Sequence, residues 1–113
     1  MRRFRAVIPF AAQASGDDIV LTNVPAGHTF AFGMISATAT FGASATIAIG
    51  IAGATGKYRA AATHTATVPT LFGVPAATDD DPLTAEETIL LTIAVAALPG
   101  SGSAVVDLYF SAP

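Results

Sequence analysis

The chain has 113 residues, of which 12% are charged and 52% are hydrophobic, and its formal net charge is −3. This length suits one two-layer core, so we expect residues 1–113 to form a single domain. The acidic balance argues against a broad basic surface for nucleic acid, and the absence of cysteine excludes disulfides and thiolate metal sites. A soluble domain normally keeps about a quarter of its residues charged, so we expect much of this surface to face other copies or a larger assembly.

The first residues predict a β-strand. Arg3 and Arg5 alternate with Phe4, Ala6 and Ile8, which is typical of a strand with one face in water. The alternative interpretation is a secretory signal. Such a signal runs about 15–30 residues around an uninterrupted apolar segment, and here a proline breaks the apolar segment early. The strand is therefore favoured.

The rest of the chain alternates short runs of Val, Ile, Phe, Thr and Ala with Gly, Pro or Asp turns. This pattern is typical of antiparallel strands in a sandwich or barrel. Helix signals are nearly absent, although the capping-box spacing of Thr84 and Glu87 predicts a short helical turn. The apolar run at residues 88–98 is shorter than the ~20 residues that a transmembrane helix needs, so we expect no membrane span. The eight or so expected strands are residues 4–10, 18–21, 29–40, 45–51, 58–62, 65–71, 88–96 and 104–110.

Two of these strands carry an aliphatic face opposite a face of mainly small side chains. Small side chains let neighbouring backbones approach closely, so this pattern indicates contact with another layer or another subunit. The aliphatic residues are Ile47, Ile49 and Ile51 in the first strand and Ile89, Leu91, Ile93 and Val95 in the second. The opposite faces hold Thr46, Ala48 and Gly50 in the first and Leu90, Thr92, Ala94 and Ala96 in the second.

The last two expected strands read as a hairpin. The residues between them, 98–103, are rich in Gly, Ser and Pro, which favour turns. On the returning strand Val106, Leu108 and Phe110 alternate with Asp107 and Tyr109. We therefore expect the first three side chains in the core and the other two on the outside.

The longest irregular segment, residues 73–87, contains an acidic cluster. Carboxylate oxygens are calcium ligands, but the spacing of an EF-hand is absent. Adjacent carboxylates on a proline-flanked loop are more often a solvated surface tip, and this is the interpretation we favour. The carboxylates concerned are Asp79, Asp80 and Asp81, with Asp17, Asp18 or Glu86 as further candidates.

The remaining motifs do not predict catalysis. The segment GATGKY resembles the end of a P-loop, but it lacks the earlier glycine and the Ser or Thr after Lys57, so a hairpin turn with an exposed Lys57 is expected. His28 and His64 have no Cys or carboxylate at ligand spacing and read as surface or interface residues. No Gly-x-Ser-x-Gly elbow occurs. We expect no catalytic, cofactor-binding or metal-binding residue.

Aromatic composition bears on sugar binding. A β-sandwich that binds carbohydrate usually presents exposed aromatic platforms, and this chain has no Trp and only Tyr58 and Tyr109 as tyrosines. Its seven phenylalanines are assigned to the core and to subunit contacts.

Four segments resemble those of small head-associated proteins of tailed phages. They are VPAGH at residues 24–28, FGASATIAIG at 41–50, GKYRAA at 56–61 and TAEETILLT at 84–92, and the resemblance covers roughly residues 19–110. It implies an antiparallel β-sandwich of the jelly-roll kind that oligomerises on a capsid as a decoration, head-spike or fibre-base protein. Gene transfer agents, which carry phage-like heads with spikes, are included in this resemblance.

The resemblance implies the major capsid protein below this chain and a spike or fibre protein above it. We therefore expect a noncatalytic virion component, made in the bacterial cytoplasm and placed on the capsid surface as a symmetric homo-oligomer such as a trimer or pentamer. No cofactor, direct nucleic acid or membrane contact is expected. The candidate interaction residues are the charges at the basic start of the chain and in the acidic loop: Arg2, Arg3, Arg5, Asp79, Asp80 and Asp81.

Two rival functions remain open at this stage. One is a carbohydrate- or receptor-binding module of a phage fibre, which predicts that the isolated protein binds a glycan. The other is a small lyase or hydrolase, which predicts a cleft that brings the acidic loop close to a histidine.

Overall fold

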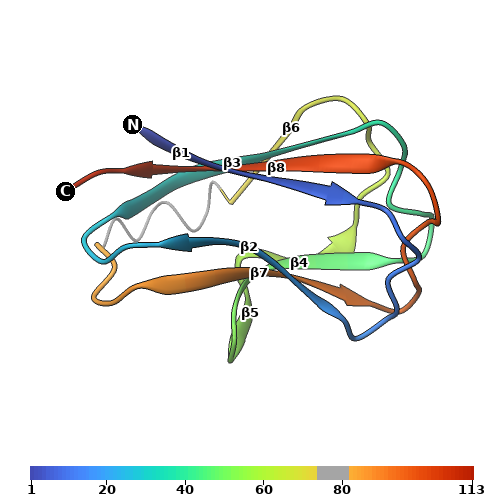
Figure 1. Ribbon diagram of the computed structural model, residues 1–113, viewed down its shortest axis with the longest axis horizontal. Helices are drawn as coiled ribbons and strands as arrows, with labels where there is room; N and C mark the ends of the chain where they lie inside the picture. The colour runs from blue at the N-terminus through green and yellow to red at the C-terminus, as the bar shows by residue number, and fades with distance from the viewer. Residues whose placement is uncertain (74–81) are drawn as a thin grey trace.

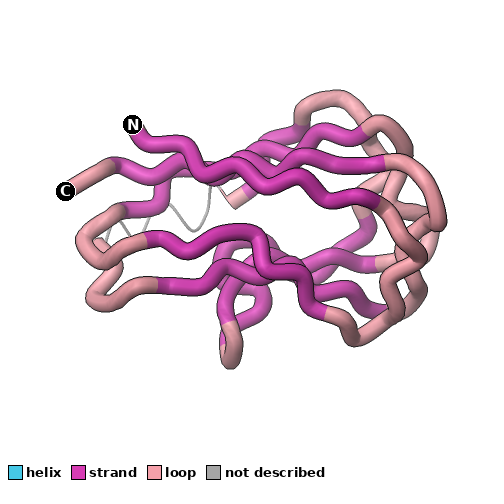
Figure 2. Tube along the Cα trace, in the orientation of Figure 1, coloured by secondary structure: helices cyan, strands magenta, loops and turns pink. Residues whose placement is uncertain are grey.

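The computed structural model describes residues 1–73 and 82–113, and its regular structure there is entirely β-strand (Figures 1 and 2). The strands overlap all eight expected ones. They are β1 (Arg2–Pro9), β2 (Asp18–Val24), β3 (Thr29–Ala37), β4 (Thr46–Ile51), β5 (Ala54–Thr63), β6 (Thr70–Phe72), β7 (Glu87–Ala94) and β8 (Ser103–Ser111). The described part of the chain contains no helix long and apolar enough to cross a membrane.

The strands form two four-stranded antiparallel sheets that pack face to face (Figure 1). We call the sheet with the order β1-β8-β3-β6 sheet A and the sheet with the order β2-β7-β4-β5 sheet B. Strand pairs run inward from the two ends of the chain: β1 with β8, β2 with β7, β3 with β6 and β4 with β5. The chain is thus one long hairpin wound across two sheets. This is a jelly roll, and the expected sandwich is confirmed.

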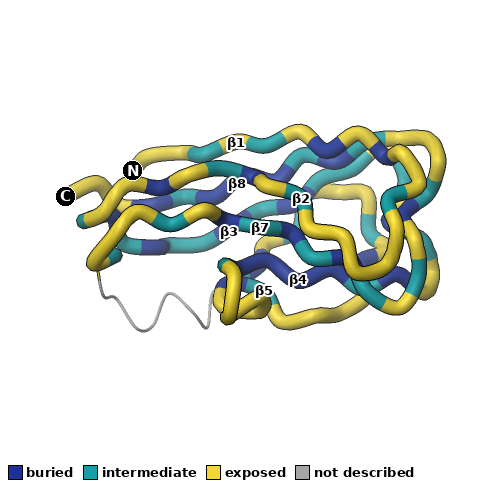
Figure 3. Tube along the Cα trace, turned by 60° about the horizontal axis from the view of Figure 1, so that its bottom comes forward, coloured by how far each residue is buried: buried dark blue, intermediate teal, exposed yellow. Residues whose placement is uncertain are grey.

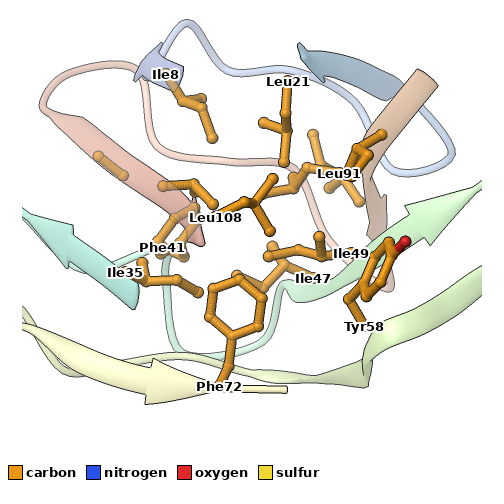
Figure 4. Packing of buried hydrophobic residues seen from close by; sticks show 14 of the residues in the cluster. Ile8, Leu21, Ile35, Phe41, Ile47, Ile49, Tyr58, Phe72, Leu91 and Leu108 are labelled. Atoms are coloured by element: carbon orange, nitrogen blue, oxygen red, sulfur yellow. The ribbon is translucent and has the colours of Figure 1, made fainter. Parts of the chain in front are cut away.

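Alternation along the strands builds the core between the two sheets. On β1, Ile8 is buried while Arg3, Arg5 and Val7 are exposed (Figure 3). The expected inner face of β8 is confirmed, because its three apolar residues are fully buried. Figure 4 shows side chains from both sheets meeting in this layer. They include Leu21, Ile35, Phe41, Ile47, Ile49, Leu91 and Leu108.

A glycine on β3 makes room for an aromatic ring from β6. Gly33 and Phe72 are register partners, and a Cβ atom at Gly33 would lie 2.1 Å from Cζ of Phe72. A larger residue at position 33 would therefore displace the ring from the core. The pair helps to fix the short strand β6 against β3.

Two local predictions were wrong. The strand expected at residues 65–71 shrinks to β6, because Pro69 has no N–H to donate and the ladder with β3 starts only at Thr70. No helical turn forms at Thr84, since Glu87 instead opens β7. The segment before β7 is held by backbone hydrogen bonds between Leu83 and the turn around His28.

The expected hairpin of the last two strands was also wrong, because β7 lies in sheet B and β8 in sheet A. The alternation of β7 ends at Ala94. Val95 takes a φ of 73° and is 73% exposed, while Ala96 packs against the core. The connection then crosses between the sheets, where Leu98 is buried and its N–H donates to the carbonyl of Gln13. A loop of this length can span the ~10 Å between packed sheets, which a tight turn cannot.

Candidate interaction surfaces

The basic start of the chain is an ordered edge strand of sheet A. Arg2 extends over the Phe4 ring at 4.9 Å, and its Nη1 lies 3.2 Å from Nε2 of His28. Because a guanidinium can only donate, Nε2 must accept, and Nδ1 then donates to the carbonyl of Pro25 at 3.1 Å. These contacts bury His28, which is 4% exposed, so its expected surface position was wrong.

The other two arginines of β1 point outward from sheet A. Nε of Arg5 lies 3.7 Å from Oδ1 of Asp107, its register partner on β8. Arg3 stands opposite Tyr109 in the same ladder. The outward position expected for Asp107 and Tyr109 is confirmed, although both are half-buried.

The register aligns these residues into rows across the outside of sheet A. Phe32 of β3 stacks on Tyr109 with ring centroids 4.6 Å apart and planes 19° apart, so Phe32 lies outside the core. Below this row the apolar side chains continue across β1, β8, β3 and β6. We call the whole set the sheet A face, and it consists of Arg3, Tyr109, Phe32, Arg5, Asp107, Met34, Leu71, Val7, Val105 and Ser36.

The outside of sheet B is more polar and less flat. The Thr92 hydroxyl donates to Asp18 at 2.8 Å, and the Thr88 hydroxyl donates to Asn23 at 2.7 Å. The hairpin between β4 and β5 projects away from this sheet (Figure 1). A Cβ atom at Gly50 would lie 2.3 Å from a backbone oxygen at the start of β5, so the chain's own hairpin supplies the close contact expected there.

A small polar cluster anchors this hairpin to β7. Glu87 forms an ion pair with Lys57 and accepts a hydrogen bond of 2.6 Å from the hydroxyl of Tyr58. Burial, reinforced by Glu87, raises the pKa of Tyr58 far above its ordinary value of 10.0. The tyrosine therefore acts as a fixed hydrogen-bond donor. Lys57 is exposed as expected, but it lies within β5 and is paired rather than solitary at a turn.

Arg59 holds the irregular part of the β4–β5 pairing together. Its guanidinium donates to the carbonyls of Ile47 at 2.5 Å, Ala62 at 3.2 Å, Thr63 at 3.3 Å and Ala60 at 3.4 Å. The register shifts on both sides of Ile49, so these carbonyls are turned out of the regular ladder. Burial lowers the pKa of Arg59 from its ordinary value. A planar group with five donors is suited to such a set of acceptors.

His64 follows β5 and is buried, at 7% exposed, so its expected surface position was also wrong. Its ring meets Phe41 edge-on, with centroids 5.7 Å apart. Nε2 has no hydrogen-bond partner among the described residues. Burial, and then the charge of Arg59, lowers the pKa of His64 below 6.5, so the ring is neutral near pH 7.

The described residues bring no three His, Cys, Asp or Glu side chains together at a spacing that could hold a metal ion. Asp79, Asp80 and Asp81 lie outside the described residues, so the structure places neither the acidic loop nor its distance from a histidine. The predictions of a solvated acidic tip, a calcium site and a catalytic cleft therefore stay predictions.

Comparisons with known proteins find similarity in structure only. No protein-family model and no curated protein sequence matches the chain. A chain in the capsid of Ralstonia phage GP4 superposes with a TM-score of 0.73 and 18% identity over 99% of this chain and 83% of its own length. A chain in the capsid asymmetric unit of cyanophage Pam1 superposes with a TM-score of 0.66 and 16% identity, over 99% and 84%. The chain therefore shares its fold, from end to end, with proteins found in phage capsids.

Proposed function

We propose that this protein is a structural component of a phage or phage-like virion and attaches to the capsid. The observation that carries the proposal is the superposition of the jelly roll on capsid chains over 99% of its length. Those chains are only slightly longer than this one, so the likeness involves whole proteins rather than a fragment of a large one.

The finer form of the proposal is a decoration protein or the base of a head spike or fibre. It forms a symmetric homo-oligomer, binds the major capsid protein on one side and can carry a spike or fibre on the other. The docking charges are Arg2, Arg3 and Arg5 on β1 and the acidic residues Asp79, Asp80 and Asp81. This assignment is supported by the concentration of arginines on one edge strand of a chain with few charges. No reaction is part of the proposal.

The test uses purified particles of the virus that encodes the chain. Mass spectrometry should find the protein at a fixed ratio to the major capsid protein, and cryo-electron microscopy should place its jelly roll on the shell. Light scattering on the isolated protein then measures its oligomeric state. Absence of the protein from intact particles would refute a virion role.

A second candidate is a carbohydrate- or receptor-binding module of a phage fibre. It is favoured by one observation that the sequence pattern missed, which is the outward stack of Phe32 on Tyr109. Two adjacent rings beside an arginine offer apolar and polar contacts to a sugar. Binding of the isolated protein to a glycan array, lost in Phe32→Ala and Tyr109→Ala, would favour this function over a purely structural one.

A further inference from the structure

The two outer faces of the sandwich differ in what they offer a partner. The outside of sheet B carries hydroxyl–carboxylate and hydroxyl–amide pairs that satisfy one another, and the β4–β5 hairpin projects from it (Figure 1). No segment of the described chain projects from the sheet A face in this way (Figures 1 and 3). A flat partner surface can therefore approach sheet A but not the whole of sheet B.

The sheet A face is largely apolar although it lies on the outside. Val7 on β1 is 65% exposed and Leu71 on β6 is 57% exposed, at opposite edges of the same sheet. Half-buried Val105, Met34 and the Phe32 ring fill the strands between them. A contiguous apolar patch of this kind, rimmed by polar groups, marks an interaction site on a soluble protein.

Charge on this face is unbalanced along β1. Arg5 has a carboxylate neighbour, Asp107, within the face. Arg3 forms no ion pair with any described residue, and its register partner is the uncharged Tyr109. Two cations and one anion leave the β1 flank of the face net positive. Oδ1 of Asp107 also lacks a hydrogen-bond donor among the described residues, so the middle of the face can accept a hydrogen bond from a partner.

We propose that the sheet A face docks on the shell-forming capsid protein, at an apolar surface flanked by carboxylates that pair with Arg3. The inference rests on the proposed function and names the surface and the partner chemistry that carry it out. Charge complementarity decides the occupant. A twofold contact between two copies of this face would add two net positive flanks to one another, whereas an acidic flank on the shell neutralises Arg3.

The chain supplies a matched pair of variants. Val7 of sheet A is 65% exposed and Val20 of sheet B is 61% exposed, and both lie on edge strands. We compare Val7→Glu, Val20→Glu and Arg3→Glu with the wild type by co-sedimentation with empty shells assembled from the major capsid protein of the same virus. Val7→Glu and Arg3→Glu should each lower binding by at least about ten-fold, and Val20→Glu should change it by less than about two-fold. Added salt should weaken wild-type binding more than Arg3→Glu binding.

The outcomes separate the inference from the proposed function. If the wild type does not bind shells, the proposed function fails. If the wild type binds and Val7→Glu binds equally, or if Val20→Glu alone loses binding, the virion role stands and the sheet A face is not the docking surface. If Val7→Glu splits an oligomer in light scattering but still binds shells, the occupant is a second copy and the inference is overturned. Circular dichroism checks folding, and the exposed Arg3→Glu carries the test if Val7→Glu does not fold.

Discussion

His64 is a buried histidine whose charge state affects stability. Its pKa is lowered in the folded protein by burial and then by Arg59, while in the unfolded chain it keeps a value of about 6.5. The unfolded state therefore binds more protons below pH ~6.5, so stability is complete above that pH and falls as pH decreases through the folded pKa. We expect the urea midpoint of the wild type to decrease more between about pH 7 and about pH 5 than that of His64→Gln. Equal decreases in the two proteins would show that His64 does not contribute.

Arg59 tests how far the geometry of a side chain, rather than its charge, supports the β4–β5 pairing. A lysine keeps the charge, but its single ammonium cannot reach the four carbonyls that the guanidinium contacts. We expect Arg59→Lys to lower the free energy of unfolding by about 1–3 kcal/mol, because buried carbonyls lose their donors. Denaturation by urea measures this. Arg3→Lys, on the exposed face of β1, is the matched control and should change stability by less than about 0.5 kcal/mol.

At the scale of elements, the β4–β5 hairpin depends on the absence of a side chain at Gly50. A Cβ atom there would lie 2.3–2.7 Å from backbone atoms of Ala54 and Thr55, which cannot rotate away as a side chain could. We expect Gly50→Ala to destabilise the protein by at least about 1–3 kcal/mol. Gly100→Ala is the control, since no atom lies within 4 Å of its Cβ position, and thermal unfolding should show little change or a small gain. Equal effects at both sites would contradict the close approach at Gly50.

The strands of this protein could be predicted from sequence because alternation is a local property. The pattern of β8 located its inner face correctly, and the first arginines were correctly placed on an edge strand with one wet face. Partners could not be predicted in the same way. An inward-facing aliphatic row is compatible with either sheet, so the pattern did not reveal that β7 and β8 lie in different sheets.

The candidate site was predictable only in part, for a similar reason. His28 is buried because Arg2, 26 residues earlier, brings a guanidinium against its ring, and no sequence window contains both residues. Phe32 was assigned to the core or a subunit contact by its residue type, but a bulge between Phe30 and Phe32 turns it outward beside Tyr109. A break in alternation within residues 29–37 was the available signal for this bulge, since Phe30, Phe32 and Ile35 cannot share one face of a regular strand.

At the scale of the whole molecule, the winding of the jelly roll makes the first and last strands interdependent. β8 lies between β1 and β3 in sheet A and contributes Val106, Leu108 and Phe110 to the core. A chain ending at Gly100 lacks these side chains and leaves β1 without a hydrogen-bonded neighbour. We expect it to show no cooperative unfolding transition in urea, because the remaining strands cannot close the core. Removing only residues 112–113, which follow β8, should preserve the transition. A truncated chain that still unfolds cooperatively would mean that sheet B and β3 suffice for folding, and would make β1 and β8 a separable layer of the virion protein.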